Sequence, residues 1–197
     1  MKKVGKFGMS DQTLLNPGEA EGLIPYIAYK WQLDELERDN IVKAKRWMST
    51  SRKLKEDYPK DYSLKLLHKK MFGDVWTWAG EYRTTEKNIG NVLSFQVHEE
   101  LRKLCDDIKY QLTPKKVDIA DIAIRFHHRL TCIHPFPNGN GRFAREATDL
   151  LLKYNGQKVF AWGIDKNDQD KVRQEYITSL RSADTGNLTP LSKFLRN

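Results

Sequence analysis

Apolar residues recur at every third or fourth position over long stretches of this chain, which is the spacing of one face of an α-helix. Polar and charged residues fill the positions between them. The stretches with this pattern are 33–48, 61–71, 97–112, 117–133, a run that begins at or just before residue 142, 167–181, and a short last one from residue 190. The sequence therefore predicts an all-α protein, a helical bundle.

One segment departs from the helical period. Between Tyr82 and Phe95 the apolar and β-branched residues follow a looser spacing, interrupted by Asn88 and by Gly90-Asn91, which predicts one small β-hairpin. Residues 1–20 are small and polar and indicate a loose arm. We expect an N-terminal arm over residues 1–30 and a single domain over residues 31–197.

Composition narrows the function classes. The 197 residues are 39% hydrophobic and 30% charged, as in a soluble globular protein, and the net charge is +8. A basic surface attracts nucleotides and acidic proteins, whereas zinc-finger spacing and long basic blocks are missing, so nucleic acid is a disfavoured partner. The basic N-terminus lacks the apolar stretch that a signal peptide needs, and no apolar run reaches the ~18 residues of a membrane span. We therefore expect a cytoplasmic protein, unless it is exported by a route that leaves no N-terminal signal. Cys105 and Cys132 are expected to be reduced, buried thiols without metal spacing.

The segment His134–Arg145, with the sequence HPFPNGNGRFAR, carries the most chemistry. It is predicted to be a loop that runs into the N-terminus of a helix, where backbone N–H groups lack partners within the helix and favour an anion. Gly139 and Gly141 allow positive φ and a close approach to a ligand. Arg142 and Arg145 are three residues apart and can face the same helix end. This combination predicts a phosphate site.

His134 stands at the entrance of this loop. An imidazole has an ordinary pKa of ~6.5, which suits a general base near neutral pH.

The segment resembles the signature of Fic-domain proteins, H-x-F-x-[DE]-G-N-G-R-x-x-R. The resemblance implies a mostly helical domain that transfers part of a nucleotide, most often AMP from ATP with Mg2+, to a Ser, Thr or Tyr hydroxyl of a target protein. It implies that His134 is the base and that Phe136 anchors the loop in the core. It also implies that Arg145 holds the terminal phosphate and that the other phosphates are held by Gly139, Asn140, Gly141 and Arg142.

The resemblance extends upstream. Trp78–Arg83, then a hairpin, then helices, then the signature is the order of Fic domains, and the chain further resembles the bacterial subgroup called mobile mystery protein B. The hairpin in the family is a flap whose edge holds the target by strand-like pairing. The residues that would supply this edge are Thr84, Thr85, Glu86, Lys87, Asn88 and Ile89. The alternative is a plain hairpin that covers the core.

One signature position differs. Asn138 replaces the family's Asp or Glu, a magnesium ligand, and an amide oxygen is a weaker ligand for this hard cation. Asn138 is therefore a weak candidate for the metal site. The substitution leaves open a catalytically weak nucleotide-binding or interaction module.

Glu21-Gly22 resembles the end of the family's inhibitory pattern, [ST]-x-x-x-E-[GN], although Pro17 replaces the hydroxyl residue. The resemblance implies that the carboxylate of Glu21 pairs with Arg145 and blocks the γ-phosphate. The alternative is an ordinary exposed glutamate.

Further alternatives remain at this point. A Fic-type phosphotransferase is disfavoured because Gly139-Asn140-Gly141 is kept, and nucleic-acid binding is disfavoured as above. A metal site of His127, His128 and His134 is also disfavoured, because adjacent helix residues point in different directions; one of these histidines is expected to hydrogen-bond in the core. Three alternatives stay open: the transferred group is AMP, UMP or GMP, the chain is a toxin or a regulator, and it acts with or without a regulatory partner protein.

Overall fold

The computed structural model describes residues 14, 21–87, 90, 92–113, 118–163 and 168–196. The chain divides into two compact units, of which the first holds residues 1–52 and 65–81 and the second holds residues 53–64 and 82–197. The predicted division into an arm (1–30) and a domain (31–197) stays a prediction. The described residues contain helices and no strand pair beyond isolated bridges, so the all-α class is confirmed.

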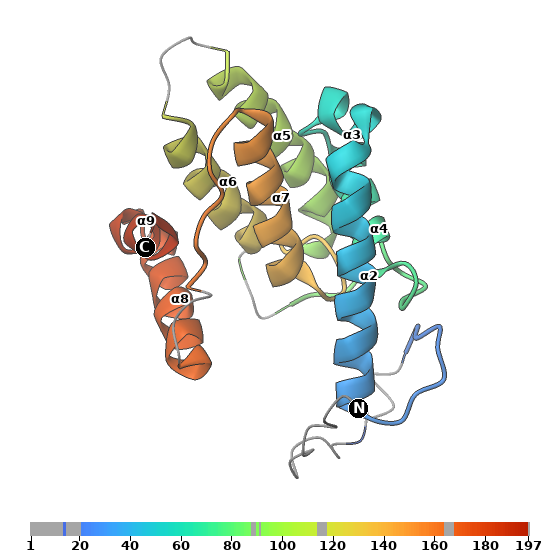
Figure 1. Cartoon of the computed structure of the whole chain (residues 1–197). Coiled ribbons are helices and arrows are strands. Elements are labelled where there is room, and N and C mark those ends of the chain that lie inside the picture. Colours follow the sequence, from blue (N-terminus) through green and yellow to red (C-terminus); the bar gives the residue numbers. More distant parts are fainter. Residues whose placement is uncertain are drawn as a thin grey trace, which may run out of the picture. The chain divides into compact units, whose positions relative to one another are not determined.

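The first unit is built on helix α2 (Lys30–Thr50) and on the part of α4 (Asp61–Phe72) from residue 65 onward (Figure 1). Two buried polar side chains of α2 connect these elements. The Asn40 amide donates to the carbonyl of Lys70 (3.0 Å) and accepts from the N–H of Asp74 (2.9 Å). The carboxylate of Glu37 accepts from the indole N–H of Trp76 (2.8 Å). These hydrogen bonds fix the turn that follows α4.

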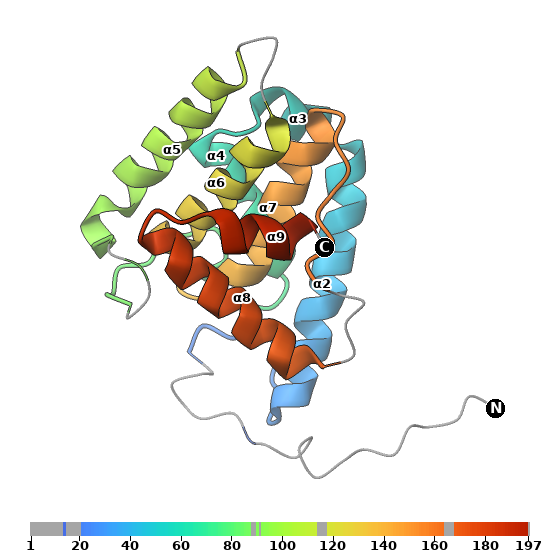
Figure 2. The ribbon, with the colours of Figure 1, turned by 90° about the vertical axis from the view of Figure 1, so that its left-hand side faces the viewer.

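The second unit is a bundle. Its helices are α3 (Arg52–Asp57), the start of α4, η2 (Ser94–Gln96), α5 (Val97–Gln111), α6 (Ile119–Ile133), α7 (Asn140–Tyr154), α8 (Gln169–Asp184) and α9 (Thr189–Arg196). Helix α6 packs between α5 and α7, and α9 packs against both α6 and α8 (Figure 2). Side chains that are fully buried in this bundle are Leu101, Ile108, Ile124, Phe126, Leu130 and Phe143. None of the helices in the described ranges is both long and apolar enough to cross a membrane.

Helix ends in the second unit are set by local chemistry. The carboxylate of Asp118 caps α6 by accepting from the N–H groups of Ala120 (2.9 Å) and Asp121 (3.2 Å). Helix α6 ends at His134 and α7 begins after Gly139, and both of these flanking residues have left-handed backbone conformations. The short connection between α6 and α7 is therefore held by two sharp turns, and it contains the predicted phosphate loop.

Candidate active site

His134 adopts a left-handed conformation (φ 49°, ψ 60°) as the residue that ends α6. This conformation is uncommon for residues other than glycine and requires support from the surrounding structure. The support comes from Arg83, whose buried side chain donates from Nε to the carbonyl of His134 (2.8 Å). The N–H of Arg83 donates to the carbonyl of Pro135 (2.9 Å). Arg83 therefore fixes the backbone on which the imidazole is mounted.

Burial lowers the pKa of His134 from its ordinary 6.5 to about 4, and the positive charges of Arg83 and Lys87 act in the same direction. The imidazole is consequently neutral at pH 7. A neutral imidazole has a free lone pair, which is the form that a general base needs.

Buried side chains fix the conformation of the loop that follows His134. Phe136 is fully buried, and its ring packs edge-on against Phe143 with centroids 4.9 Å apart. The buried Asn140 amide accepts from the N–H of Phe136 (2.9 Å) and donates to its carbonyl (2.7 Å). The side chain of Asn140 therefore shapes the loop, and the expected phosphate contact of Asn140 stays a prediction. Its backbone N–H at the start of α7 can still face an anion.

The start of α7 leaves room for a ligand. Gly139 precedes the helix with φ 76°, as expected for a turn glycine. Apart from its two chain neighbours and the nearby backbone of α7, no described atom lies within 4 Å of the position that a Cβ of residue 141 would take. The fold itself thus does not require a glycine at position 141, and the open space lies where an anion would approach the helix.

A cleft of about 1180 Å³ opens in front of this helix end. Its lining includes His134, Asn138 and the residues from Gly139 to Arg142, together with Arg145. Helix α8 forms another wall, which sequence reasoning did not assign to the site. Its contributions include Asp170, Arg173, Tyr176, Arg181 and Asp184. With four arginines against two aspartates in the lining, the cleft has the charge balance expected for a phosphorylated ligand.

Asn138 does not fit a magnesium ligand well. It is exposed, and its amide oxygen accepts a hydrogen bond from the N–H of Gly139 (2.7 Å). A neutral oxygen that already accepts this bond is a poor partner for a hard cation. Asn138 instead helps to form the turn before α7.

The predicted hairpin is wrong in its strand pairing. Among the described residues of the segment (82–87, 90, 92–95) none is in a strand. The carbonyls of Thr85 and Val92, which a ladder would use, accept instead from the guanidinium of Arg83 (3.0 and 2.5 Å). Thr84, Thr85 and Glu86 are exposed, as a docking edge would be. Asn88 and Ile89 lie outside the described residues.

Two further contacts hold this segment (described residues 82–87, 90 and 92–95), which we call the flap segment. The carboxylate of Glu86 accepts from the N–H (3.0 Å) and the hydroxyl (2.7 Å) of Ser94, and these bonds lower its pKa. Gly90 has φ 74°, and a Cβ there would stand 2.0 Å from the carbonyl oxygen of Cys132. Only glycine fits at this contact, which joins the flap to the end of α6.

Glu21 and Gly22 belong to the first unit and Arg145 to the second, so the inhibitory pairing stays a prediction. Gly22 has a local role in its own unit. It has φ 81°, a Cβ there would stand 2.6 Å from Cδ1 of Trp78, and its carbonyl accepts from the N–H of Thr77 (2.9 Å). The glycine is therefore explained by packing, while the side chain of Glu21 is exposed.

His127 and His128 have separate environments. The buried His127 ring contacts the hydroxyls of Thr148 (3.2 Å) and Tyr176 (2.7 Å), and burial lowers its pKa to about 3. This is the core hydrogen bonding expected of one of the two histidines, and it joins α6, α7 and α8. His128 faces Asp184 instead. The structure therefore does not bring His127, His128 and His134 together as a metal site.

The two cysteines are free, but only Cys105 is buried. The expectation that Cys132 is also buried is wrong, because it lies beside the cleft. Burial and the neighbouring Asp184 raise the pKa of its thiol to about 12, so it is protonated at neutral pH and donates to Asp184 (3.3 Å).

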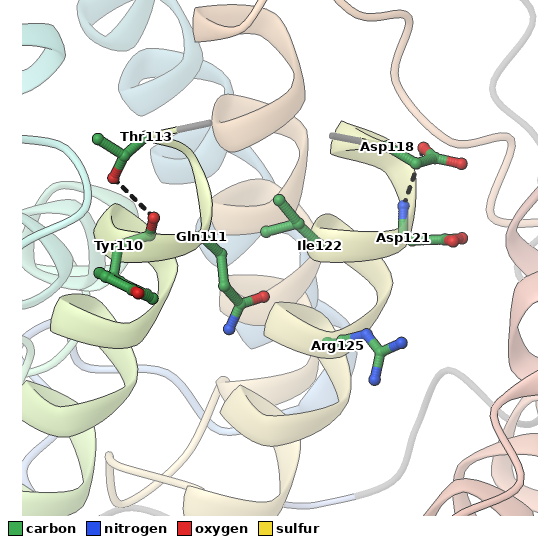
Figure 3. A pocket seen from close by; sticks show the side chains of 7 residues that line it. All are labelled: Tyr110, Gln111, Thr113, Asp118, Asp121, Ile122 and Arg125. Atoms are coloured by element: carbon green, nitrogen blue, oxygen red, sulfur yellow. Dashed lines mark hydrogen bonds between the residues drawn. The ribbon is translucent and has the colours of Figure 1, made fainter. Parts of the chain in front are cut away.

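A second hollow, of about 730 Å³, lies between the end of α5 and the start of α6 (Figure 3). Two of its polar side chains take part in contacts within the protein: Asp118 caps α6, and Asp121 pairs with Arg196 (2.6 Å). None of the predicted site residues lines it.

Part of the chain is similar to known proteins. Residues 59–152 match the model of the Fic/DOC family. The protein adenylyltransferase fic-1 of Caenorhabditis elegans is 29% identical over 133 residues, which are 66% of this chain and 25% of the relative. A probable protein adenylyltransferase of Aquifex aeolicus is 34% identical over 82 residues, which are 42% of this chain and 23% of that protein. The chain thus spans about a quarter of the length of these curated relatives.

A solved structure shares the fold. The structure of C. elegans Fic-1 (residues 134–508) superposes with a TM-score of 0.65 at 25% identity, covering 80% of this chain and 46% of the other. The resemblance to mobile mystery protein B stays a prediction.

Proposed function

Because this chain contains a domain of the Fic/DOC family, we propose that it transfers the AMP group of ATP to a hydroxyl group on a target protein. The curated relatives named above are adenylyltransferases or probable ones. The chemistry of the residues in the candidate active site supports this proposal.

The observation that carries the proposal is the state of His134. Its imidazole is kept neutral and is mounted on a backbone that Arg83 fixes, at the edge of a cleft lined by arginines. A target hydroxyl placed beside it can give up its proton to the imidazole while the oxygen attacks the α-phosphorus of ATP. The new bond joins the target oxygen to the α-phosphorus, the bond to the bridging oxygen breaks, and pyrophosphate leaves.

The phosphates would lie at the N-terminus of α7. Backbone N–H groups of the first turn, the gap over Gly141 and the guanidinium groups of Arg142 and Arg145 suit phosphate oxygens. These groups stabilise the charge that develops on the leaving pyrophosphate. Magnesium is expected to accompany the nucleotide, but the proposed steps need no ligand from Asn138.

The target would dock beside the flap segment, whose exposed residues include Thr84 and Thr85. The guanidinium of Arg83 donates hydrogen bonds to the carbonyls of Thr85 and Val92 in this segment and to the carbonyl of His134. The same side chain therefore supports the docking surface and the base. We propose that this shared support sets the distance between the bound hydroxyl and the imidazole.

The test is intact-mass analysis of the chain and of candidate target proteins after incubation with ATP. A mass gain of one adenylyl group supports the proposal. A gain of one phosphoryl group would instead identify a phosphotransferase. Saturable ATP binding without any mass gain would identify a nucleotide-binding module, the alternative that the engaged amide of Asn138 favours.

A further inference from the structure

Three side chains with different metal-binding donors meet at one wall of the cleft. His128 and Cys132 are four residues apart on α6, and Asp184 is the last residue of α8. Nε2 of His128 lies 2.8 Å from Oδ1 of Asp184, and Sγ of Cys132 lies 3.4 Å from that nitrogen and 3.3 Å from that oxygen. The three donor atoms thus form a compact triangle.

The size of this triangle can be compared with a zinc site. With Zn–N and Zn–O bonds of about 2.0 Å, a Zn–S bond of about 2.3 Å and tetrahedral angles, the donor atoms stand about 3.3 to 3.6 Å apart. The upper end of this range applies to pairs that include sulfur, and the two distances from the sulfur are within about 0.3 Å of it. The nitrogen–oxygen distance needs to open by about 0.5 Å. Asp184 can supply this movement, because its side chain is 54% exposed.

The triangle has access to solvent on one side. Cys132 and Asp184 line the same cleft as His134, whereas the side chain of His128 is 17% exposed. An ion can therefore enter from the cleft, and a fourth ligand can approach from there. His127, the neighbour of His128, takes no part, because both of its ring nitrogens face hydroxyl groups in the core.

We propose that His128, Cys132 and Asp184 bind a Zn2+ ion whose fourth coordination position faces the cleft. One imidazole nitrogen, one thiolate sulfur and one carboxylate oxygen are a donor set that zinc takes in proteins, and three protein ligands are usual where one position stays open. When the Zn–S bond forms, the thiol proton leaves to solvent. Without the ion the same proton holds the triangle together, as a hydrogen bond from Cys132 to Asp184.

Such an ion would connect α6 to α8. A ligand that binds the folded chain and not the unfolded one stabilises the fold, so zinc should raise the melting temperature of the full chain. The ion would also lie near the phosphate loop, since Cys132 is two residues before His134. This site is independent of the nucleotide reaction, and its test does not depend on enzymatic activity.

The experiment uses the full chain without a histidine tag, first freed of metal with a chelator under reducing conditions. Zn2+ is titrated by calorimetry, and Co2+ replaces it as an optical probe for a thiolate ligand. The variants are Cys132→Ser, His128→Gln and Asp184→Asn. The matched control is Cys105→Ala, because Cys105 is the other free cysteine and lies in α5. Circular dichroism checks that each variant is folded.

The expected result is one Zn2+ per chain, a thiolate-to-cobalt charge-transfer band and a rise in melting temperature with zinc. Removal of a residue that only hydrogen-bonds to a metal ligand costs about 10- to 100-fold in metal affinity, so loss of a ligand itself should cost more than about 100-fold. The Cys105→Ala variant should keep the band and the affinity. Absence of zinc binding, or zinc binding that survives in Cys132→Ser and Asp184→Asn, would overturn the proposal and leave only a hydrogen-bonded triad.

Discussion

The buried guanidinium of Arg83 donates a hydrogen bond of 2.8 Å to the backbone carbonyl of His134, the residue that ends α6 in a left-handed conformation. The same guanidinium reaches the carbonyls of Thr85, Val92 and Ile133. One side chain thus holds the base, the helix end and both sides of the flap segment. Arg83 is in our account a positioning residue that acts through His134.

Replacement of Arg83 by lysine tests whether the hydrogen-bonding geometry of this side chain matters in addition to its positive charge. Arg83→Lys keeps the positive charge but removes the planar fork, so some of the four carbonyls lose their donor. Each buried group left unpaired costs about 1 to 3 kcal/mol of unfolding free energy, measurable by urea denaturation. The rate of transfer should fall more than about tenfold, with a smaller change in the KM for ATP.

The matched control is Arg196→Lys, whose guanidinium pairs with Asp121 at a partly exposed site. It should leave the rate unchanged. A variant Arg83→Lys with reduced stability and a normal rate would show that Arg83 supports the fold and does not position the base.

Gly141→Ala tests whether the gap over α7 is reserved for a phosphate. Beyond its chain neighbours and the nearby backbone of α7, no described atom lies within 4 Å of the added Cβ, so the free energy of unfolding should stay the same or rise by at most about 1 kcal/mol. Nucleotide affinity should fall roughly 10- to 100-fold, the equivalent of one charge-assisted hydrogen bond. Calorimetric titration with a non-hydrolysable ATP analogue measures it. An unchanged affinity would place the phosphates elsewhere.

Glu21→Gly tests the predicted inhibitory contact. If the carboxylate competes with the γ-phosphate for Arg145, its removal should raise auto-modification by roughly 10- to 100-fold, the equivalent of a charge-assisted pair. The control is Glu19→Gly, two residues away on the same segment. Equal rates in both variants and the unmodified chain would show that Glu21 is an ordinary exposed side chain.

Stability should depend on pH through His127. Its pKa is lowered from 6.5 to about 3, so between these values the unfolded chain binds a proton that the folded chain excludes. The contribution of His127 to stability is therefore complete above pH 6.5 and is lost as the pH falls. At pH 5 the loss is about 2 kcal/mol.

Urea denaturation at pH 7 and pH 5 measures this loss. The variant His127→Gln should have a smaller difference between the two pH values than the unmodified chain. An equal difference in both proteins would contradict the pKa of His127. His134, whose pKa is also lowered, contributes in the same direction.

The helices were predictable because a single periodicity determines them. Helix α6 shows it well, with Ile122, Phe126, Leu130 and Ile133 buried at helical spacing. Helix α3 was not predicted, because its six residues contain one buried apolar side chain, Leu54. A single apolar residue cannot show the helical spacing. The hairpin was predicted from residue types, which do not reveal that Arg83 occupies the carbonyls a ladder needs.

The site was predictable to the extent that its residues are consecutive. His134, Phe136 and the glycines lie in one segment, and the structure places them together. The wall formed by α8 comes from far along the chain and has no local signal. The triad at the cleft illustrates the difference. The spacing of His128 and Cys132 can be read from the sequence, whereas Asp184 is 52 residues beyond Cys132 and only the fold brings it close.

In the proposed reaction His134 acts as the base that takes the proton of the target hydroxyl. The most direct measurement compares the unmodified chain with His134→Ala, using ATP labelled at the α-phosphate, and measures both nucleotide affinity and the rate at which label enters protein. We predict that the rate falls by ~10²–10⁴-fold while the affinity for ATP stays within a few-fold. Undiminished labelling in His134→Ala, or a loss of labelling explained entirely by lost ATP binding, would contradict the account.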